Sequence, residues 1–459
     1  MQAFPSWQQG ERDEYPVLRG AQRADVAIVG GGLTGLTLAA MLSGQGLDVA
    51  LVEARRLATG NTWASTGKVT AQLAEVYPRI AQTVGLEAAG TYARLIHESM
   101  HGVASLCGTM GVPCAWQGIS VYSRKEEDDA QLSEIFRAEK NIGLPVQRSG
   151  DVGDCPIPVA RAIHMQQEQL VVEPVRYALA LARLASQRGC RIWENSPVRR
   201  MEGLRLYTPG GHIEALHVVL ATGYPLGTLH LPLLGMLEQR LGVTRVLWGG
   251  APFHMSHLAA AENGLNFRPL GDGRMLLSCE LSRVGERGLE ERFRKLNWQQ
   301  QRLLRDWQQT EDITRQDVWS EDGLPLIGPI SREDGRTLIA TGYSGWGVAN
   351  SFLAGRILTG DLLGKPLAEE ALFEPARKYP GRLLATMKGS AKSAGALAAG
   401  LVRFGAPICP HMGCRLRYDL EERQWECPCH GSTFTVLGET THGPAIKDAN
   451  VSRRQRPDA

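Results

Sequence analysis

The sequence predicts an α/β fold for most of the chain and a small, cysteine-rich domain near its C-terminal end. Two short apolar runs, residues 26–29 and 49–52, flank a helical pattern, and glycines mark the turn after the first run. Runs of this length are typical of buried strands, and strands that alternate with helices are typical of a parallel sheet. Four cysteines between Cys409 and Cys429 indicate a separate site that this pattern does not explain.

A dinucleotide site is predicted at the first turn. Gly30, Gly32 and Gly35 form G-x-G-x-x-G, whose glycines allow a tight turn, close approach of a pyrophosphate and close helix–strand contact. The helix N-terminus offers free N–H groups to a diphosphate. Glu53, at the end of the second strand, can accept hydrogen bonds from ribose hydroxyls and repel a 2′-phosphate. The alternative is an ordinary glycine-rich strand-to-helix turn.

Length and charge narrow the class of protein. The 459 residues suggest two to four domains. The net charge of +2 favours neither nucleic acid nor an anionic membrane surface as a partner. No apolar run approaches the roughly 18 residues of a membrane-spanning helix. The N-terminal residues lack the basic start and apolar middle of a signal peptide, so a cytoplasmic protein is expected.

Apolar periodicity and glycine punctuation predict the remaining elements. Residues 1–24 are a polar lead-in in which Trp7 and Tyr15 could serve as anchors. The predicted helices are residues 82–107, 174–190 and 288–308, and the predicted strands are residues 190–201 and 215–223. A hairpin is predicted over residues 265–280, and residues 337–347 are predicted as a strand that leads through glycines into a helix over about 349–358. Residues 54–73, rich in Gly, Ser and Thr, favour a loop around a cofactor over a plain surface loop.

One metal-binding motif is more simply explained as part of a helix surface. His97, Glu98 and His101 match H-E-x-x-H, the pattern of zinc proteases. The positions where the extended motif has glycine and a third histidine are Ala104 and Cys107. We therefore expect two histidines on a partly exposed helix face.

The C-terminal cysteines come with histidines at ligand spacing. Cys409-x-His411 and Cys427-x-x-His430 place one thiolate and one imidazole in each of two loops. Two thiolates and two imidazoles could hold either a tetrahedral zinc ion or a [2Fe–2S] centre with histidines on one iron.

The two sequence motifs that contain these residues, CPHMGC and CPCHGS, resemble those of the Rieske iron–sulfur family. The resemblance implies that Cys409, His411, Cys427 and His430 are the [2Fe–2S] ligands and that Cys414 and Cys429 form a disulfide. Phe434 stands where high-potential members carry a tyrosine, although Ser432 can still donate to a cluster sulfur, so a mid-range potential is expected. The short region before Cys409 predicts a small, reduced all-β domain.

The longer part of the chain resembles the FAD-dependent oxidoreductases of the D-amino-acid oxidase/glycine oxidase superfamily, in the branch that ends in a Rieske domain. The motifs are VAIVGGGLTG, ATGNTWASTGKVTAQ, VVLATG, DGLPLIG and ATGYSGWG, in that order. The resemblance implies a discontinuous α/β FAD-binding domain of Rossmann type and an α+β cap. The expected divisions are a lead-in at 1–24, an oxidoreductase region at 25–365, a linker at 366–400 and a Rieske domain at 401–459. Within the oxidoreductase region, the FAD-binding segments are expected at about 25–75, 165–225 and 320–365, and the cap segments at about 76–164 and 226–319.

The same resemblance implies the residues that hold FAD. Those expected at the ADP half are Gly30, Gly31, Gly32, Leu33, Thr34, Gly35, Glu53, Ala54 and Arg55. Those expected elsewhere along the cofactor are Thr66, Gly67, Lys68, Val69, Val198, Ala221, Thr222, Gly223, Gly342, Gly345, Trp346 and Gly347. No cysteine or histidine stands out for covalent attachment, so FAD is expected to be held non-covalently.

The catalytic candidates are side chains expected to line the substrate site: Lys68, Arg268, Tyr343 and Trp346. Arg268 also flanks the predicted hairpin turn, where a solvated strand-end arginine is the simpler interpretation. The leading hypothesis is oxidation of an amine or amino acid at the flavin, with single electrons relayed through the cluster to a redox partner protein or another acceptor. The alternatives are a flavin reductase fed through the cluster and a redox sensor or carrier without turnover.

Overall fold

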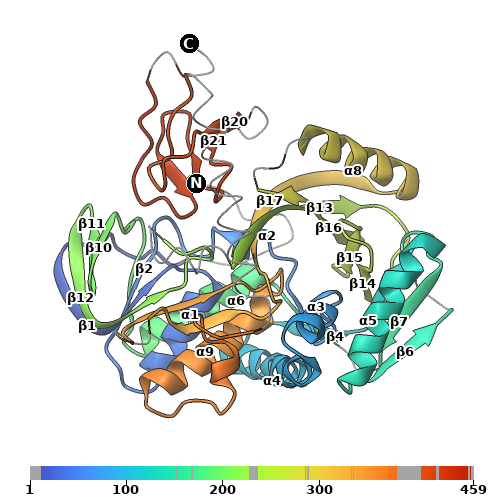
Figure 1. Ribbon diagram of the computed structural model, residues 1–459, viewed down its shortest axis with the longest axis horizontal. Coiled ribbons are helices and arrows are strands. Elements are labelled where there is room, and N and C mark those ends of the chain that lie inside the picture. Colours follow the sequence, from blue (N-terminus) through green and yellow to red (C-terminus); the bar gives the residue numbers. More distant parts are fainter. Residues whose placement is uncertain are drawn as a thin grey trace.

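The computed structural model describes residues 12–150, 154–166, 169–226, 236–284, 286, 289–331, 333, 335–379, 405–419, 423–452 and 455. Two large sheets form the body, and a small C-terminal sheet stands at the top of the view in Figure 1, above the junction of the two. Trp7 and most of the expected linker lie outside the described residues.

The first sheet contains the glycine-rich turn. Its path is β10 (Arg200–Glu202), β11 (Arg205–Thr208), β12 (Gly211–Leu220), β1 (Gly20–Val29), β2 (Val49–Val52) and β9 (Arg191–Trp193), with β19 (Thr337–Thr341) paired to β12 and β18 (Leu326–Pro329) paired to β19. The strands from β12 to β9 and the β12–β19 pair run parallel. All four residues of β2 are buried, as expected of a strand covered on both faces.

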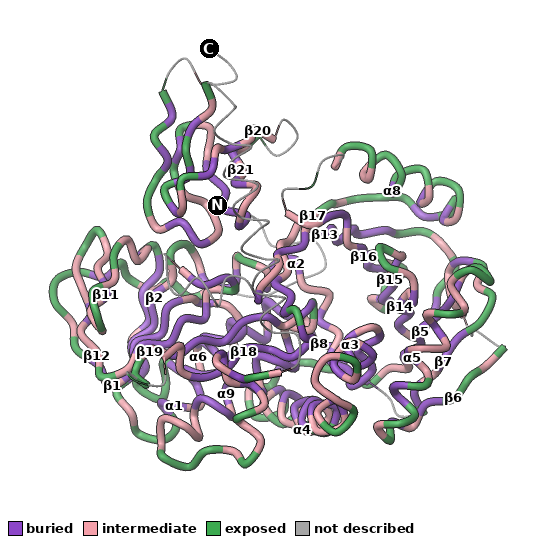
Figure 2. Tube along the Cα trace, viewed as in Figure 1, coloured by how far each residue is buried: buried purple, intermediate pink, exposed green. Residues whose placement is uncertain are grey.

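Helices cover one face of this sheet and share its largest hydrophobic core (Figure 2). Those that pack on the sheet are α1 (Leu33–Ser43), α6 (Pro174–Gln187) and α9 (Gly347–Leu362), and the core extends to α3 (Val76–Thr83) and α4 (Leu86–Met110). The helix predicted over 82–107 therefore begins at Leu86. Gly85, with φ +130°, separates it from α3 because a left-handed residue interrupts helical geometry.

The second sheet takes its strands from two distant parts of the chain. Its order is β17 (Gln308–Ser320), β13 (Leu237–Trp248), β16 (Arg274–Arg283), β15 (Asn266–Pro269), β14 (Ser256–Ala259), β5 (Ile119–Ser123), β7 (Arg161–Met165) and β6 (Val146–Ser149). The predicted hairpin is confirmed as β15 and β16. Helices η1 (Glu126–Asp128) and α5 (Asp129–Asn141) lie at the β5–β7–β6 end of this second sheet, and α8 (Leu289–Leu303) packs near its other end, on β16.

Smaller elements complete the description. The segment predicted as a loop around a cofactor, 54–73, contains α2 (Asn61–Ala64) and β3 (Lys68–Val69). Strand β3 joins β8 (Gln169–Val172) and β4 (Cys114–Gln117) in a three-stranded sheet. The strand predicted over 190–201 is two strands, β9 and β10, since Asn195 has φ +49° between them. A short η2 (Glu370–Leu372) follows α9.

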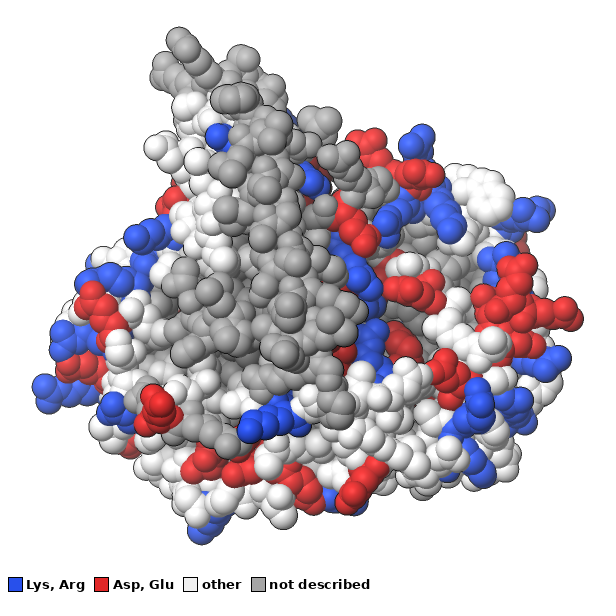
Figure 3. All heavy atoms as spheres, viewed as in Figure 1, with Lys and Arg blue, Asp and Glu red and all other residues white. Residues whose placement is uncertain are grey.

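The C-terminal sheet is a four-stranded antiparallel meander, which confirms the expected all-β domain. Its strands are β20 (Arg417–Asp419), β21 (Gln424–Glu426), β22 (Thr433–Phe434) and β23 (Thr440–His442). It has its own small core around Trp425 and Phe434. Figure 3 shows acidic and basic side chains interspersed over the described surface of one face, in keeping with the small net charge. Within the described ranges, no helix has both the length and the apolar content to cross a bilayer.

Candidate functional site

The glycine-rich turn joins β1 to α1 in a geometry that only glycine can adopt. Gly30 has φ +114°, and a Cβ there would lie 2.5 Å from the Ala221 carbonyl oxygen at the end of β12. A Cβ at Gly35 would collide with the Gly30 carbonyl oxygen. The N-cap residue of α1, Gly32, has no side chain, and the first turn has no acidic residue; the Leu33 N–H donates to the Thr62 hydroxyl at 3.2 Å. The N-terminus of α1 is therefore left available to an anionic group.

Glu53 closes the turn from the neighbouring strand. Its Oε2 accepts a hydrogen bond from the Gly31 N–H at 2.7 Å, and its Oε1 accepts one from the Arg55 N–H at 2.9 Å. These two bonds fix the carboxylate beside the cavity in the position that a ribose-binding acid requires.

A cavity of about 440 Å³ extends from this turn to the second sheet. Most of the residues predicted to bind cofactor line it: Gly30, Gly31, Gly32, Leu33, Thr34, Glu53, Ala54, Arg55, Thr66, Lys68, Val198, Ala221, Thr222, Gly223, Gly342, Gly345, Trp346 and Gly347. Gly35, Gly67 and Val69 lie behind this lining. The glycine turn without side chains and the fixed Glu53 carboxylate fit the ADP half of FAD.

A second helix N-terminus meets the same cavity. After β19 the chain turns through Gly342 and Gly345, which have φ +75° and +83°, and α9 begins without a side-chain cap. Thr34 of α1 donates a hydrogen bond to the Tyr343 hydroxyl at 3.2 Å and also contacts Ser351 of α9 at 3.0 Å. Two positive helix ends therefore converge on one cavity, where they can stabilise negative charge on a bound group.

The catalytic candidates lie in two layers. Lys68, Tyr343 and Trp346 line the cavity. Arg268 lies one layer back, where its guanidinium donates to the Thr66 carbonyl oxygen. It is only 6% exposed, so the interpretation as a solvated strand-end arginine is wrong.

Charged side chains that sequence reasoning missed lie near the predicted Lys68 on the cavity wall. They are Glu75, just before α3, and Glu280 and Arg315 on β16 and β17 of the second sheet. Burial, then the charges of Arg315 and Arg268, lower the pKa of Lys68 to about 7. Burial, then the charge of Glu280, raise the pKa of Glu75 to about 7. Arg315 pairs with Asp317 at 2.7 Å, and Glu280 pairs with Arg240 at 3.0 Å.

This wall therefore offers both signs of charge to a small molecule in the cavity. The only sequence signal was the run of charged residues within a strand, RQDVW in β17, because charges in a strand that is not solvated need partners or a ligand.

The C-terminal loops bring the predicted metal ligands together. Cys409 and Cys427 are buried, and their thiols lie in hydrogen-bonding contact. The rings of His411 and His430 are 5.1 Å apart at 84°, and both Nδ1 atoms are buried. Ser432 contacts the Cys409 thiol. Two thiols and two imidazoles at one place fit the donor set of a [2Fe–2S] cluster with mixed ligands.

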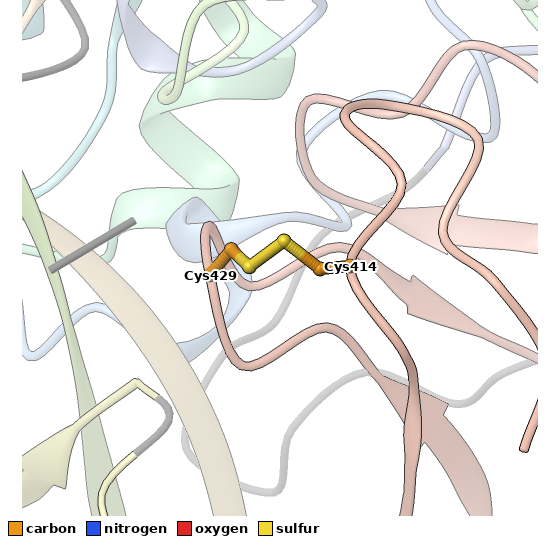
Figure 4. Close-up of a disulfide and its surroundings, with 2 residues drawn as sticks. All are labelled: Cys414 and Cys429. Carbon is orange, nitrogen blue, oxygen red and sulfur yellow. A yellow bond between two sulfur atoms is a disulfide. The ribbon is translucent and has the colours of Figure 1, made fainter. Parts of the chain in front are cut away.

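The expected disulfide is confirmed. Cys414 and Cys429 are bonded across the tips of the two loops (Figure 4). Their sulfur atoms also lie within 4.8 Å of the Cys427 sulfur. Because they are bonded to each other, they hold the loops together and leave Cys427 to act with Cys409.

The H-E-x-x-H motif on α4 does not form a comparable set of metal ligands. The His97 and His101 rings are 4.9 Å apart on α4, but the Glu98 carboxylate accepts hydrogen bonds from Arg94 at 2.6 Å and Arg356 at 2.9 Å. Within the described residues, the sulfurs of Cys414, Cys427 and Cys429 are the only three potential ligand atoms that all lie within 4.8 Å of one another, so no such group forms on α4.

The cluster loops rest against the body beside the cavity. The Tyr224 ring is 6.0 Å from the His430 ring, and Tyr224 also lines the cavity. Gly431 packs so closely on Gln239 of β13 that a Cβ would overlap the amide oxygen. One side chain, Tyr224, therefore contacts both sites.

Comparisons with known proteins match the body of the chain and its C-terminal domain to two different families. Residues 25–360 match the family described as FAD dependent oxidoreductase, and residues 396–452 match the Rieske [2Fe-2S] domain. The chain is 24% identical to the putative Rieske 2Fe-2S iron-sulfur protein YhfW of Bacillus subtilis, with 94% of each chain covered.

Two solved structures share the fold of the body. Glycine oxidase from Geobacillus kaustophilus has a TM-score of 0.62 at 21% identity, covering 78% of this chain and 99% of its own. L-proline dehydrogenase from P. horikoshii has a TM-score of 0.63 at 16% identity, covering 78% of this chain and 98% of its own.

Proposed function

Because the chain belongs to the FAD dependent oxidoreductase family and carries a C-terminal Rieske [2Fe-2S] domain, we propose that it oxidises an amine or amino acid and relays the electrons singly through the cluster. FAD, when bound, accepts an electron pair from an organic donor and can release it one electron at a time. The chain's own residues must then hold the donor, exclude water and bring the cluster close.

The charged wall is suited to a donor that carries both an amino group and a carboxylate. Lys68 supplies a cation at the cavity surface. Glu75 and Glu280, the second of which pairs with Arg240, supply carboxyl groups of the opposite sign. Opposite charges at fixed positions orient a zwitterion before reaction. The names of glycine oxidase and L-proline dehydrogenase, which share the fold, point to the same substrate class.

The position of Tyr224 carries the proposal of a relay. Its ring lines the cavity and also packs on His430, one of the four proposed cluster ligands. An electron leaving the cavity would therefore cross a single aromatic side chain to reach the ligand shell. The acceptor beyond the cluster is proposed to be a redox partner protein.

The test is anaerobic mixing of the protein with a panel of amines and amino acids. We expect one class of compound to bleach the flavin absorbance and then to reduce the cluster, seen by electron paramagnetic resonance. Tyr224→Leu should slow the second step more than the first. Tyr207→Leu, on β11 and away from the cavity lining, is the matched control.

Two results would contradict the proposal. Bleaching of the flavin that is never followed by cluster reduction would exclude the relay. A cluster that accepts electrons from a reductant and passes them to the flavin, with no donor active in the panel, would instead favour the reductase alternative.

A further inference from the structure

The C-terminal domain contributes directly to the wall of the cofactor cavity. Residues 440–446, which form β23 and the turn after it and are called here the closing segment, line the same cavity as the glycine turn and Glu53. The match to the FAD-dependent family ends at residue 360, and the closing segment belongs to the Rieske match. Neither match assigns a nucleotide contact to it.

The closing segment is held against the ADP side of the cavity by Arg199. The Arg199 Nη1 donates to the Ile446 carbonyl oxygen at 3.4 Å and pairs with the Asp448 carboxylate at 3.1 Å. The same Asp448 oxygen accepts a hydrogen bond from the Thr440 N–H at 2.9 Å, which closes the segment into a loop. Arg199 lines the cavity next to Val198.

His442 is the side chain of the segment that faces the nucleotide end. It lines the cavity, and the group that acts on its charge is Arg55, two residues after Glu53. Burial, then Arg55, lower the pKa of His442 to about 4, so its imidazole is neutral at pH 7. A neutral ring beside a ribose-binding carboxylate can donate or accept one hydrogen bond without repelling Arg55.

The closing segment packs directly on the cluster loop. Gly443 has φ +102°, and a Cβ there would collide with the Ser432 backbone, two residues after His430. The Ser432 hydroxyl accepts a hydrogen bond from the Ala445 N–H at 3.1 Å. Closing the cavity and seating the cluster beside Tyr224 are therefore the same docking event.

We propose that the Rieske domain forms part of the FAD-binding site, with the closing segment covering the ADP half, so that the domain retains FAD in addition to exchanging electrons. Retention follows because FAD contacts both domains and can leave only when they separate. The inference rests on FAD occupying this cavity and does not depend on which donor is oxidised.

The test measures FAD release from the full-length protein. Asp448→Lys replaces the ion pair to Arg199 by a repulsion, and His442→Ala removes the ring that faces the nucleotide. Glu439→Lys makes the same charge change on an exposed residue of the same domain outside the cavity lining. Recovery of flavin fluorescence after dilution gives the release rate, and the cluster's visible circular dichroism reports that the domain is folded.

We expect Asp448→Lys to release FAD about fivefold faster or more, the factor that corresponds to losing an exposed ion pair at the upper end of its usual strength. His442→Ala should release it faster by about the same factor, since one hydrogen bond is worth on the order of 1 kcal/mol. Glu439→Lys should match the unaltered protein. Unchanged release in both test variants, with intact cluster spectra, would overturn the proposal. If Asp448→Lys does not fold, His442→Ala decides alone. A failed donor panel with accelerated release would count against the proposed substrate and not against this inference.

Discussion

Substitution of Gly431 tests whether the cluster works from the position in which it is docked. Gly431 follows the proposed ligand His430 and has φ +67°. A methyl group at this position would overlap the Gln239 amide oxygen and would lie 2.9 Å from the Gln316 amide oxygen. Gln239 is 5% exposed, so its side chain has little room to withdraw. Gly431→Ala should therefore push the cluster loop away from β13.

The size of the effect follows from two costs. A left-handed backbone costs a residue with a Cβ about 1–2 kcal/mol, whether or not the domains touch. Overpacking a buried contact costs about 1–3 kcal/mol, and only this part depends on docking. The original contact geometry thus becomes less populated by a factor of about 5 to 150, since each 1.4 kcal/mol is about tenfold. The rate of flavin-to-cluster transfer should fall by a similar factor.

The assay is anaerobic stopped-flow reduction with an active donor, or with dithionite if none is found, following flavin absorbance and cluster reduction separately. Gly431→Ala/Gln239→Ala removes the overlapping side chain and should recover most of the transfer rate, although the backbone cost remains. Gln239→Ala alone is the matched control. Transfer that is unchanged in Gly431→Ala, with a normal cluster spectrum, would refute the docked geometry, and so would a loss that the double variant does not relieve.

Three further substitutions have expected outcomes. Phe434→Tyr places a hydroxyl in the core that surrounds the cysteine loops, at the position where high-potential Rieske proteins carry a tyrosine. It should raise the reduction potential of the cluster in protein-film voltammetry. No rise would count against matching Phe434 to that tyrosine. Since Lys68 loses its charge as pH rises through about 7, KM for an amino acid donor should increase above that pH. Lys68→Met should abolish this increase and leave only the opposite change caused by Glu75, which becomes ionised near the same pH. An increase that persists in Lys68→Met would assign it to another group. Burial raises the pKa of Glu139 to about 8 from 4.5, so folding stability should fall as pH rises from 4.5 to 8. Glu139→Gln should remove that fall. In urea unfolding, the variant should be more stable than the unaltered protein at pH 8 by on the order of a few kcal/mol, and the two proteins should be equally stable at pH 4. Two proteins of equal stability at both pH values would refute the pKa shift.

Features that depend on local sequence could be predicted. The β1–α1–β2 unit needs glycine at Gly30 and Gly35 because neighbouring backbone leaves no room for a Cβ, and that requirement is visible as a motif. The cysteine loops are equally local, because ligands and disulfide fall within two short segments. Both were therefore located from the sequence alone.

Features that depend on long-range pairing could not be predicted. Glu280 and Arg315 meet at one wall because β16 and β17 both pair with β13, and no local pattern encodes that register. Glu75 joins them from the residue before α3. Arg268 looked like a surface residue since its partner, the Thr66 carbonyl oxygen, is about 200 positions away. The closing segment lines the cavity through domain docking, which leaves no periodic signal.

The most direct test of the central claim is the dependence of cluster reduction on protein concentration. After the flavin has been bleached anaerobically, transfer within one chain is first order, because both redox groups belong to the same molecule. The rate constant should therefore stay the same over a hundredfold range of protein concentration. A rate that rises in proportion to protein concentration would show that electrons pass between molecules, and it would contradict the docked relay through Tyr224.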